Sequence, residues 1–157
     1  MKFKNSLEKK LKYKIMSHFM IKGKKATCEK ILVKGLKRMQ KLYTKSHSEI
    51  TKIAILNVTP IFRVIQLQEK RKKKKKKGAK RAKEVPAFLS HYNFRTSWAL
   101  KLLLDSVKKR SKNKRFSEEL QQEIIAASQN SGESVQVKIE TQKTVLKKKF
   151  YFKYYRW

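Results

Sequence analysis

The chain has 157 residues, of which 39% are hydrophobic, and its 43 Lys and Arg against 11 Asp and Glu give a formal net charge of +32. This length fits one domain with a single core, and the charge makes a compact body repel itself strongly. No stretch approaches the roughly 18 apolar residues of a membrane-spanning helix, and the single cysteine, Cys28, excludes a disulfide framework and a cysteine metal cluster. A polyanionic partner is predicted, with nucleic acid well ahead of an anionic membrane surface, because phosphates neutralise lysines and release counterions.

Three amphipathic helices are predicted in the first part of the chain, at residues 6–21, 26–42 and 46–57, because apolar residues recur there at helical spacing opposite lysines. Gly23 separates the first two helices, and Ser46 or Ser48 caps the third. The apolar stripe of the first helix ends on Phe19 and Met20. The stripe expected to be buried in the third helix is Ile50, Ile53, Ala54 and Val58.

The apolar period changes from helical to alternating after Pro60, which predicts a β-hairpin at about residues 60–90. Its first strand is "PIFRVIQLQ" and its second is "EVPAFL", where Pro86 is tolerated only on an edge strand. The eleven lysines and arginines of residues 70–83 lie between these strands, with Gly78 near the predicted tip.

Three further helices are predicted at residues 94–110, 116–130 and 134–149, followed by a basic-aromatic tail at 150–157. Ser117 is the expected cap of the second of these helices and Gly132 its expected terminator. The predicted fold is mainly α: one domain over residues 1–157, a bundle of about six helices with an inserted, protruding β-hairpin between the third and fourth helices.

The sequence gives little support for catalysis, and neither a cofactor, a metal nor a small-molecule substrate is predicted. His18, His47 and His91 lie far apart without acidic or cysteine partners at motif spacing. Glu118 and Glu119 are adjacent, so on a helix they point about 100° apart. The four glycines are scattered and form no phosphate-binding loop.

Basic clusters are the functional signal of this sequence. Lysine is far commoner than arginine, which favours contacts to the phosphate backbone over base reading, although an A+T-rich genome would give the same bias. Aromatic residues of the tail are expected partly to pack on the core and partly to stack on RNA. On charge and position, the cations predicted to bind RNA are Lys22, Lys70, Arg71, Lys72, Lys73, Lys74, Lys75, Lys76, Lys77, Lys80, Arg81, Lys83 and Lys153.

Six ordered stretches resemble one known family: "MIKGKKATCEKIL" (20–32), "NVTPIFRV" (57–64), "EVPAFL" (84–89), "ALKLLLDSVKKRS" (99–111), "ELQQEIIAASQNSG" (119–132) and "YRW" (155–157). They resemble the ribosomal protein S-seven family of the small-subunit head. The resemblance implies a helical bundle with a protruding hairpin that binds the 3′ major domain of small-subunit ribosomal RNA and nucleates assembly of the head. It also implies neighbouring head proteins as partners, with exit-site tRNA and mRNA nearby and no membrane.

The resemblance further assigns RNA contacts residue by residue: Lys24, Lys25, Thr27, Arg63, Lys108, Lys109, Arg110, Arg156 and Trp157. Two features depart from the family pattern. The long lysine run replaces a short turn of the hairpin, and the family's helix tryptophan aligns with Leu102, whereas this chain has Trp98 one turn earlier.

A mitochondrial ribosome, with the protein encoded and made inside the organelle, is the expected location, because the composition is of A+T type, no presequence pattern is visible and the chain stops at "YRW". A plastid or a bacterial cytoplasm is the alternative. The competing functions are a nonspecific DNA-binding or chromatin-like protein, and a nuclear protein whose lysine run is a localisation signal.

Overall fold

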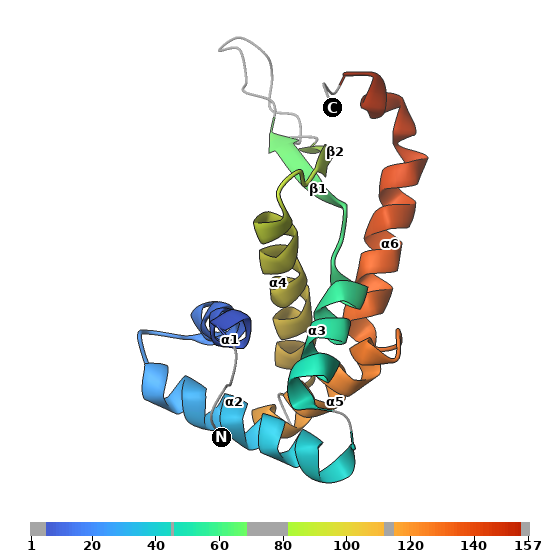
Figure 1. Ribbon diagram of the computed structural model, residues 1–157. Coiled ribbons are helices and arrows are strands. Elements are labelled where there is room, and N and C mark those ends of the chain that lie inside the picture. The colour runs from blue at the N-terminus through green and yellow to red at the C-terminus, as the bar shows by residue number, and fades with distance from the viewer. Residues whose placement is uncertain (1–5, 45, 69–81, 112–114, 155–157) are drawn as a thin grey trace.

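The computed structural model describes residues 6–44, 46–68, 82–111 and 115–154, with the backbone alone at the ends of some of these segments. Six α-helices and one hairpin follow one another in this part of the chain (Figure 1). They are α1 (Ser6–Phe19), α2 (Lys25–Leu42), α3 (His47–Val58), β1 (Phe62–Gln68), β2 (Ala82–Phe88), α4 (Tyr92–Arg110), α5 (Phe116–Ser128), α6 (Glu133–Lys147) and a final 3-10 helix, η1 (Lys149–Tyr154). The predicted fold class, a helical bundle with a hairpin between the third and fourth helices, is confirmed.

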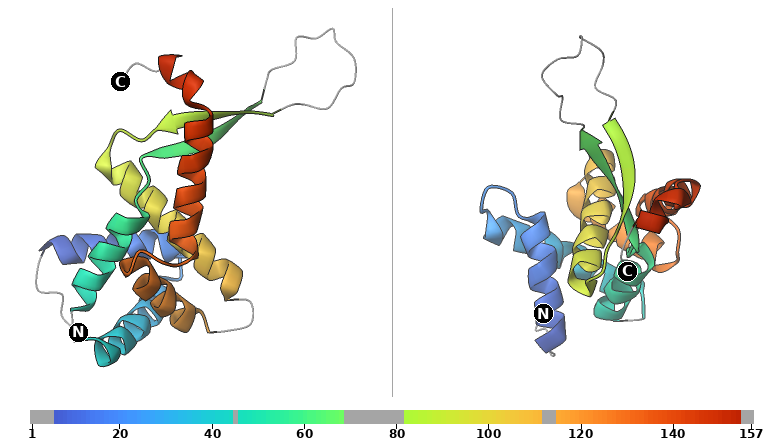
Figure 2. Two further views of the ribbon diagram at one scale, coloured as in Figure 1. Left: turned by 90° about the vertical axis from the view of Figure 1, so that its right-hand side faces the viewer. Right: turned by 90° about the horizontal axis from the view of Figure 1, so that it is seen from above.

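Helix α5 lies at the centre of the helical body, in contact with α2, α3, α4 and α6 (Figures 1 and 2). The core is apolar, and Met39, Ala54, Val58, Val107 and Ala127 have no exposed side-chain surface. Full burial of one large apolar side chain contributes about 1.5–3 kcal/mol, and all six helices contribute residues to this core, which holds them in a fixed arrangement.

Three of the predicted apolar positions lie outside the core, and the first is Leu42, the last residue of the predicted second helix, which is 68% exposed. Met20 is 41% exposed because α1 ends at Phe19 and the chain turns away. Ile53 is 40% exposed, whereas Ile55 is buried beside Ala54, so the buried stripe of α3 is rotated from the predicted one. Tertiary packing against α5 decides which side of this largely apolar helix is covered.

The helix ends correct two predictions and confirm a third. Ser46 caps α3, accepting a hydrogen bond from the Ser48 backbone N–H. Ser117 does not cap α5, because the helix starts one residue earlier and Arg115 occupies the cap position. Gly132 does not end α5: the left-handed residue that ends it is Asn130 (φ 59°), whose N–H donates to Ala127 O in a Schellman-type turn. Gly132 (φ 102°) instead caps the start of α6.

The hairpin pairs β1 with β2 in antiparallel register, with Val64 opposite Pro86. In the described part of the chain these two strands form the whole sheet, so each is an edge strand. Proline is tolerated on an edge strand, which explains how Pro86 fits within β2. The base of the hairpin contacts α6, and Phe62 of β1 stacks on Phe152 of η1 with ring centroids 5.3 Å apart. The hairpin therefore leaves the body at one end, beside the end of α6 (Figure 2).

Candidate nucleic-acid interface

The connection between α1 and α2 presents a compact group of exposed cations. Lys22 (φ 51°) and Gly23 (φ 72°) are the central residues of a type I′ turn, closed by a hydrogen bond of 3.2 Å from Lys24 N to Ile21 O. The turn leaves the side chains of Lys22, Lys24 and Lys25 exposed. Thr27 is exposed on the first turn of α2, so Lys22, predicted on charge, and the three residues assigned by the resemblance share one accessible ridge.

The second predicted cluster, at the C-terminal end of α4, divides into two kinds of residue. Lys108 is exposed, and a cation there suits the negative end of the helix dipole. Lys109 Nζ lies 3.6 Å from a carboxylate oxygen of Glu133. Arg110 is bound within the chain: its Nη2 donates to the Glu123 carboxylate, and its Nε lies 3.5 Å from Glu119 Oε2. Its RNA contact stays a prediction, beside a clear structural role.

Glu123 organises the junction of α4, α5 and α6. Its side chain is fully buried, and besides Arg110 it accepts hydrogen bonds from Ser134 N (2.9 Å) and Ser134 Oγ (2.5 Å). A carboxylate at the start of α6 also suits the helix dipole. A Cβ on Gly132 would lie 3.1 Å from Glu123 Oε1, so the close approach of this turn needs glycine.

Arg63 of β1 is half-buried over the ring of Trp98 of α4, with its Cζ 5.6 Å from the ring centroid. Lys101, one turn along α4, also lies over this ring at 5.0 Å. Arg63 Nε is buried and has no hydrogen-bond partner among the described residues. The tryptophan that departs from the family pattern is thus the ring on which two cations rest.

Lys153 of η1 is exposed, next to aromatic residues that differ in their burial. Phe152 is half-buried against Phe62, whereas Phe150 is 56% exposed. The ring of Tyr151 lies 4.1 Å from that of Phe150. One face of this short helix is therefore used by the fold, and its other face carries a cation and an open ring.

The structure does not gather the predicted cations at one point. The hairpin base and η1 lie at one end of the molecule, the C-terminal end of α4 at the other, and the α1–α2 connection on one flank (Figure 1). The predictions at positions 70–77, 80, 81, 156 and 157 lie outside the described residues, as does the side chain of Lys83. A single partner that contacts all the described clusters must be large enough to reach both ends and one flank of the molecule, as a large folded nucleic acid is.

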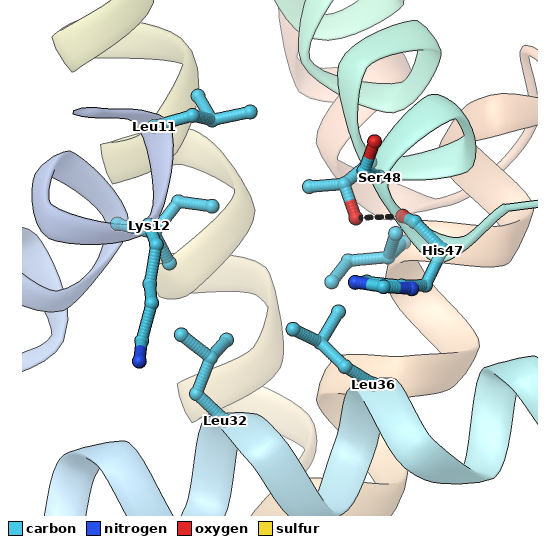
Figure 3. A pocket seen from close by; sticks show the side chains of 9 residues that line it. Leu11, Lys12, Leu32, Leu36, His47 and Ser48 are labelled. Atoms are coloured by element: carbon cyan, nitrogen blue, oxygen red, sulfur yellow. Dashed lines mark hydrogen bonds between the residues drawn. The ribbon is translucent and has the colours of Figure 1, made fainter. Parts of the chain in front are cut away.

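An apolar pocket between α1, α2, α3 and α5 is the natural place to look for a small ligand (Figure 3). Leu11, Leu32 and Leu36 line it, and Thr51 Oγ1 at its edge donates a hydrogen bond to His47 O at 2.7 Å. It has the character of a gap between packed helices. Over the described residues, no group of His, Cys, Asp or Glu is arranged to hold a metal ion, and no helix is long and apolar enough to cross a membrane.

Sequence reasoning missed Lys101 and the role of Glu123. Lys101 stands three residues after Trp98 on one helix, a spacing that places their side chains together and could have shown the contact. Glu119 and Glu123 are likewise one turn apart, but their cation, Arg110, comes from another helix and left no local signal.

A small, highly basic helical body with an inserted hairpin and cationic clusters spread over several faces has the features of a ribosomal protein. The family model described as "Ribosomal protein S7p/S5e" matches residues 2–149, so the chain belongs to this family and the predicted family is confirmed.

Individual relatives agree. The chain is 30% identical over 131 residues to "Small ribosomal subunit protein uS7c" of Euglena gracilis, covering 83% of this chain and 77% of the relative. It is 33% identical over 129 residues to the protein of that name from Euglena longa, covering 82% and 67%. The bacterial "Small ribosomal subunit protein uS7" of Thermotoga petrophila is 28% identical over 144 residues, covering 92% and 85%.

Proposed function

We propose that this protein is a structural constituent of the small ribosomal subunit that binds the 3′ major domain of the ribosomal RNA and helps to assemble the head. The proposal is supported by the family match over residues 2–149 and by relatives named as small-subunit proteins. The structural observation that carries it is the exposed ridge of Lys22, Lys24, Lys25 and Thr27, which lies on a hydrogen-bonded turn and the first turn of α2. Neighbouring head proteins are its further partners, and the hairpin is directed to the exit-site tRNA and mRNA.

The RNA contact is tested by the salt dependence of binding to a fragment of small-subunit ribosomal RNA. Each lost phosphate contact lowers the log–log slope by about 0.7 on single strands and about 0.9 on duplex. Replacing Lys22, Lys24 and Lys25 by Gln should therefore reduce the slope by about 2–3. The matched control replaces three exposed lysines of α2 outside this motif by Gln: Lys34, Lys37 and Lys41.

The control should change the slope by less than one contact. Equal losses in both variants, or equal affinity for a DNA duplex of the same length, would instead favour the nonspecific DNA-binding alternative. In cells, the chain should co-sediment with the small subunit and stay bound in moderate salt, and a chain that sediments free would refute the proposal.

The ribosome in question is that of an organelle or of a bacterium, and we place it in the mitochondrion. The A+T-type composition supports an organelle genome. Fractionation of the source cells decides the question, because enrichment with plastid or cytoplasmic ribosomes would contradict the mitochondrial location.

A further inference from the structure

One segment of this basic chain carries no cation at all. Residues 116–137 contain none of the 43 Lys and Arg and hold four of the 11 acidic residues, Glu118, Glu119, Glu123 and Glu133. Lys and Arg otherwise occur about once in three residues, so a run of this length without one is a marked exception. The segment comprises α5, the turn after it and the start of α6.

The outer side of this segment forms a groove with the C-terminal end of α2, which we call the α2–α5 groove. Leu42 and Tyr43 line it on one side, and Gln122, Ile125 and Gln129 on the other. The two helices lie side by side (Figure 2, left), and α2 is packed tightly on the start of α5. Leu42 is 68% exposed and Tyr43 39%, so the groove presents open apolar surface.

The electrostatics of the α2–α5 groove set it apart from the lysine-covered faces. Arg38 is the one cation among its lining residues, and its Nη1 is paired with Glu118 Oε1 at 2.8 Å. The lining is therefore close to neutral. A phosphate backbone gains little there, because favourable binding of nucleic acid depends on cations that replace its counterions. A protein partner suits an apolar, neutral groove better.

We propose that the α2–α5 groove docks a basic segment of a neighbouring protein, which inserts an apolar side chain between Leu42 and Ile125 and hydrogen-bonds to Gln122 and Gln129. The partner is basic because any protein held on the same polyanion needs cations, and the remainder of this +32 chain repels such a partner. No lysine is among the lining residues of the α2–α5 groove, so two basic proteins can meet there with less repulsion than on the lysine-covered faces. The inference rests on the proposed function, which supplies the particle where they are neighbours.

Site-specific photocrosslinking in assembled small subunits tests the proposal. Gln122→p-benzoylphenylalanine places the probe in the groove, and Thr27→p-benzoylphenylalanine places it on the predicted RNA ridge as a control; both positions are exposed. After irradiation, the Gln122 probe should give a protease-sensitive product with another protein, and the Thr27 probe a nuclease-sensitive product. A Gln122 probe that links to RNA, or to nothing in particles where Thr27 links to RNA, overturns the inference. Failure of the wild-type chain to co-sediment with the subunit would overturn the proposed function instead.

An added charge gives a second test, with opposite expectations for the two kinds of partner. Gln122→Lys puts a cation into the groove, whereas Gln136→Lys adds the same charge at an exposed position of α6 outside it. If a basic protein occupies the groove, Gln122→Lys should lower retention of that protein on salt-washed subunits several-fold, and Gln136→Lys should leave it unchanged. Unchanged or stronger retention with Gln122→Lys contradicts a basic occupant.

Discussion

Removing the carboxylate of Glu123 should destabilise the protein more than any single surface change. Glu123→Ala leaves the buried N–H and hydroxyl groups of Ser134 without their acceptor, at about 1–3 kcal/mol for each orphaned donor. It also removes the partner of Arg110, which is 37% exposed and so recovers part of its loss in water. Because two buried donors are orphaned and the loss at Arg110 is partly screened by water, we expect a decrease of about 2–4 kcal/mol in the free energy of unfolding.

The assay is urea unfolding of the RNA-free full chain, followed by far-UV circular dichroism. Gln122→Ala is the matched control, because it truncates the adjacent exposed side chain on the same helix and should change the free energy by less than about 0.5 kcal/mol. Glu123→Gln separates charge from shape, since the amide oxygen still accepts from Ser134, and should fall between the two. If Glu123→Ala costs no more than the control, the reasoning is refuted, and the three contacts add no net stability.

Four further changes test other parts of the structure. Leu104→Asp buries an unpaired charge where the side chain is 4% exposed, and should abolish the cooperative unfolding transition; a normal transition would refute this. Gly132→Ala forces a side chain on a residue at φ 102°, and should lower the urea midpoint by an amount equivalent to about 1–3 kcal/mol. A hydrogen bond from Lys12 lowers the pKa of Glu29. The stabilisation from this pair is therefore present above the usual Glu pKa of about 4.3 and is lost as the pH falls through the lowered value. Glu29→Gln should flatten the acid-side decline of the urea midpoint, and an unchanged pH profile would contradict a stabilising role for the pair. Burial raises the pKa of Cys28, so iodoacetamide should alkylate the folded chain much more slowly than the urea-unfolded chain, and equal rates would contradict the packed thiol.

The sequence predicted the features that local patterns encode. Apolar spacing located all six helices, and the change to an alternating pattern after Pro60 located the hairpin. Helix ends were less predictable: Ser117 has the chemistry of a cap, but α5 begins at Phe116, whose side chain packs against the core and Phe19. The sequence shows which residues can cap a helix, but it does not show which end position tertiary packing will favour.

The sequence predicted which residues of the candidate interface are cations, but not which of those cations contact other parts of the protein. Exposure of the cations at 22–25 follows from a polar turn between two amphipathic helices, and the sequence shows both. The role of Arg63 depends on its contact with Trp98 on a helix far along the chain. The role of Arg110 depends on how α4 and α5 pack, because that packing brings Glu119 and Glu123 to it. Arg63 and Arg110 therefore contact other side chains of the protein, whereas Lys108 is exposed, and the sequence alone does not distinguish the three.

The attachment of the hairpin has a mechanical consequence. Its base is held on one side by Arg63 resting on Trp98 of α4, and on the other by Glu84, which accepts a hydrogen bond of 2.5 Å from Lys148 at the end of α6. The stack of Phe62 on Phe152 adds a third point of support. A load applied along the strands is consequently shared between two long helices, so the hairpin is mounted as a braced arm whose direction is fixed by the body.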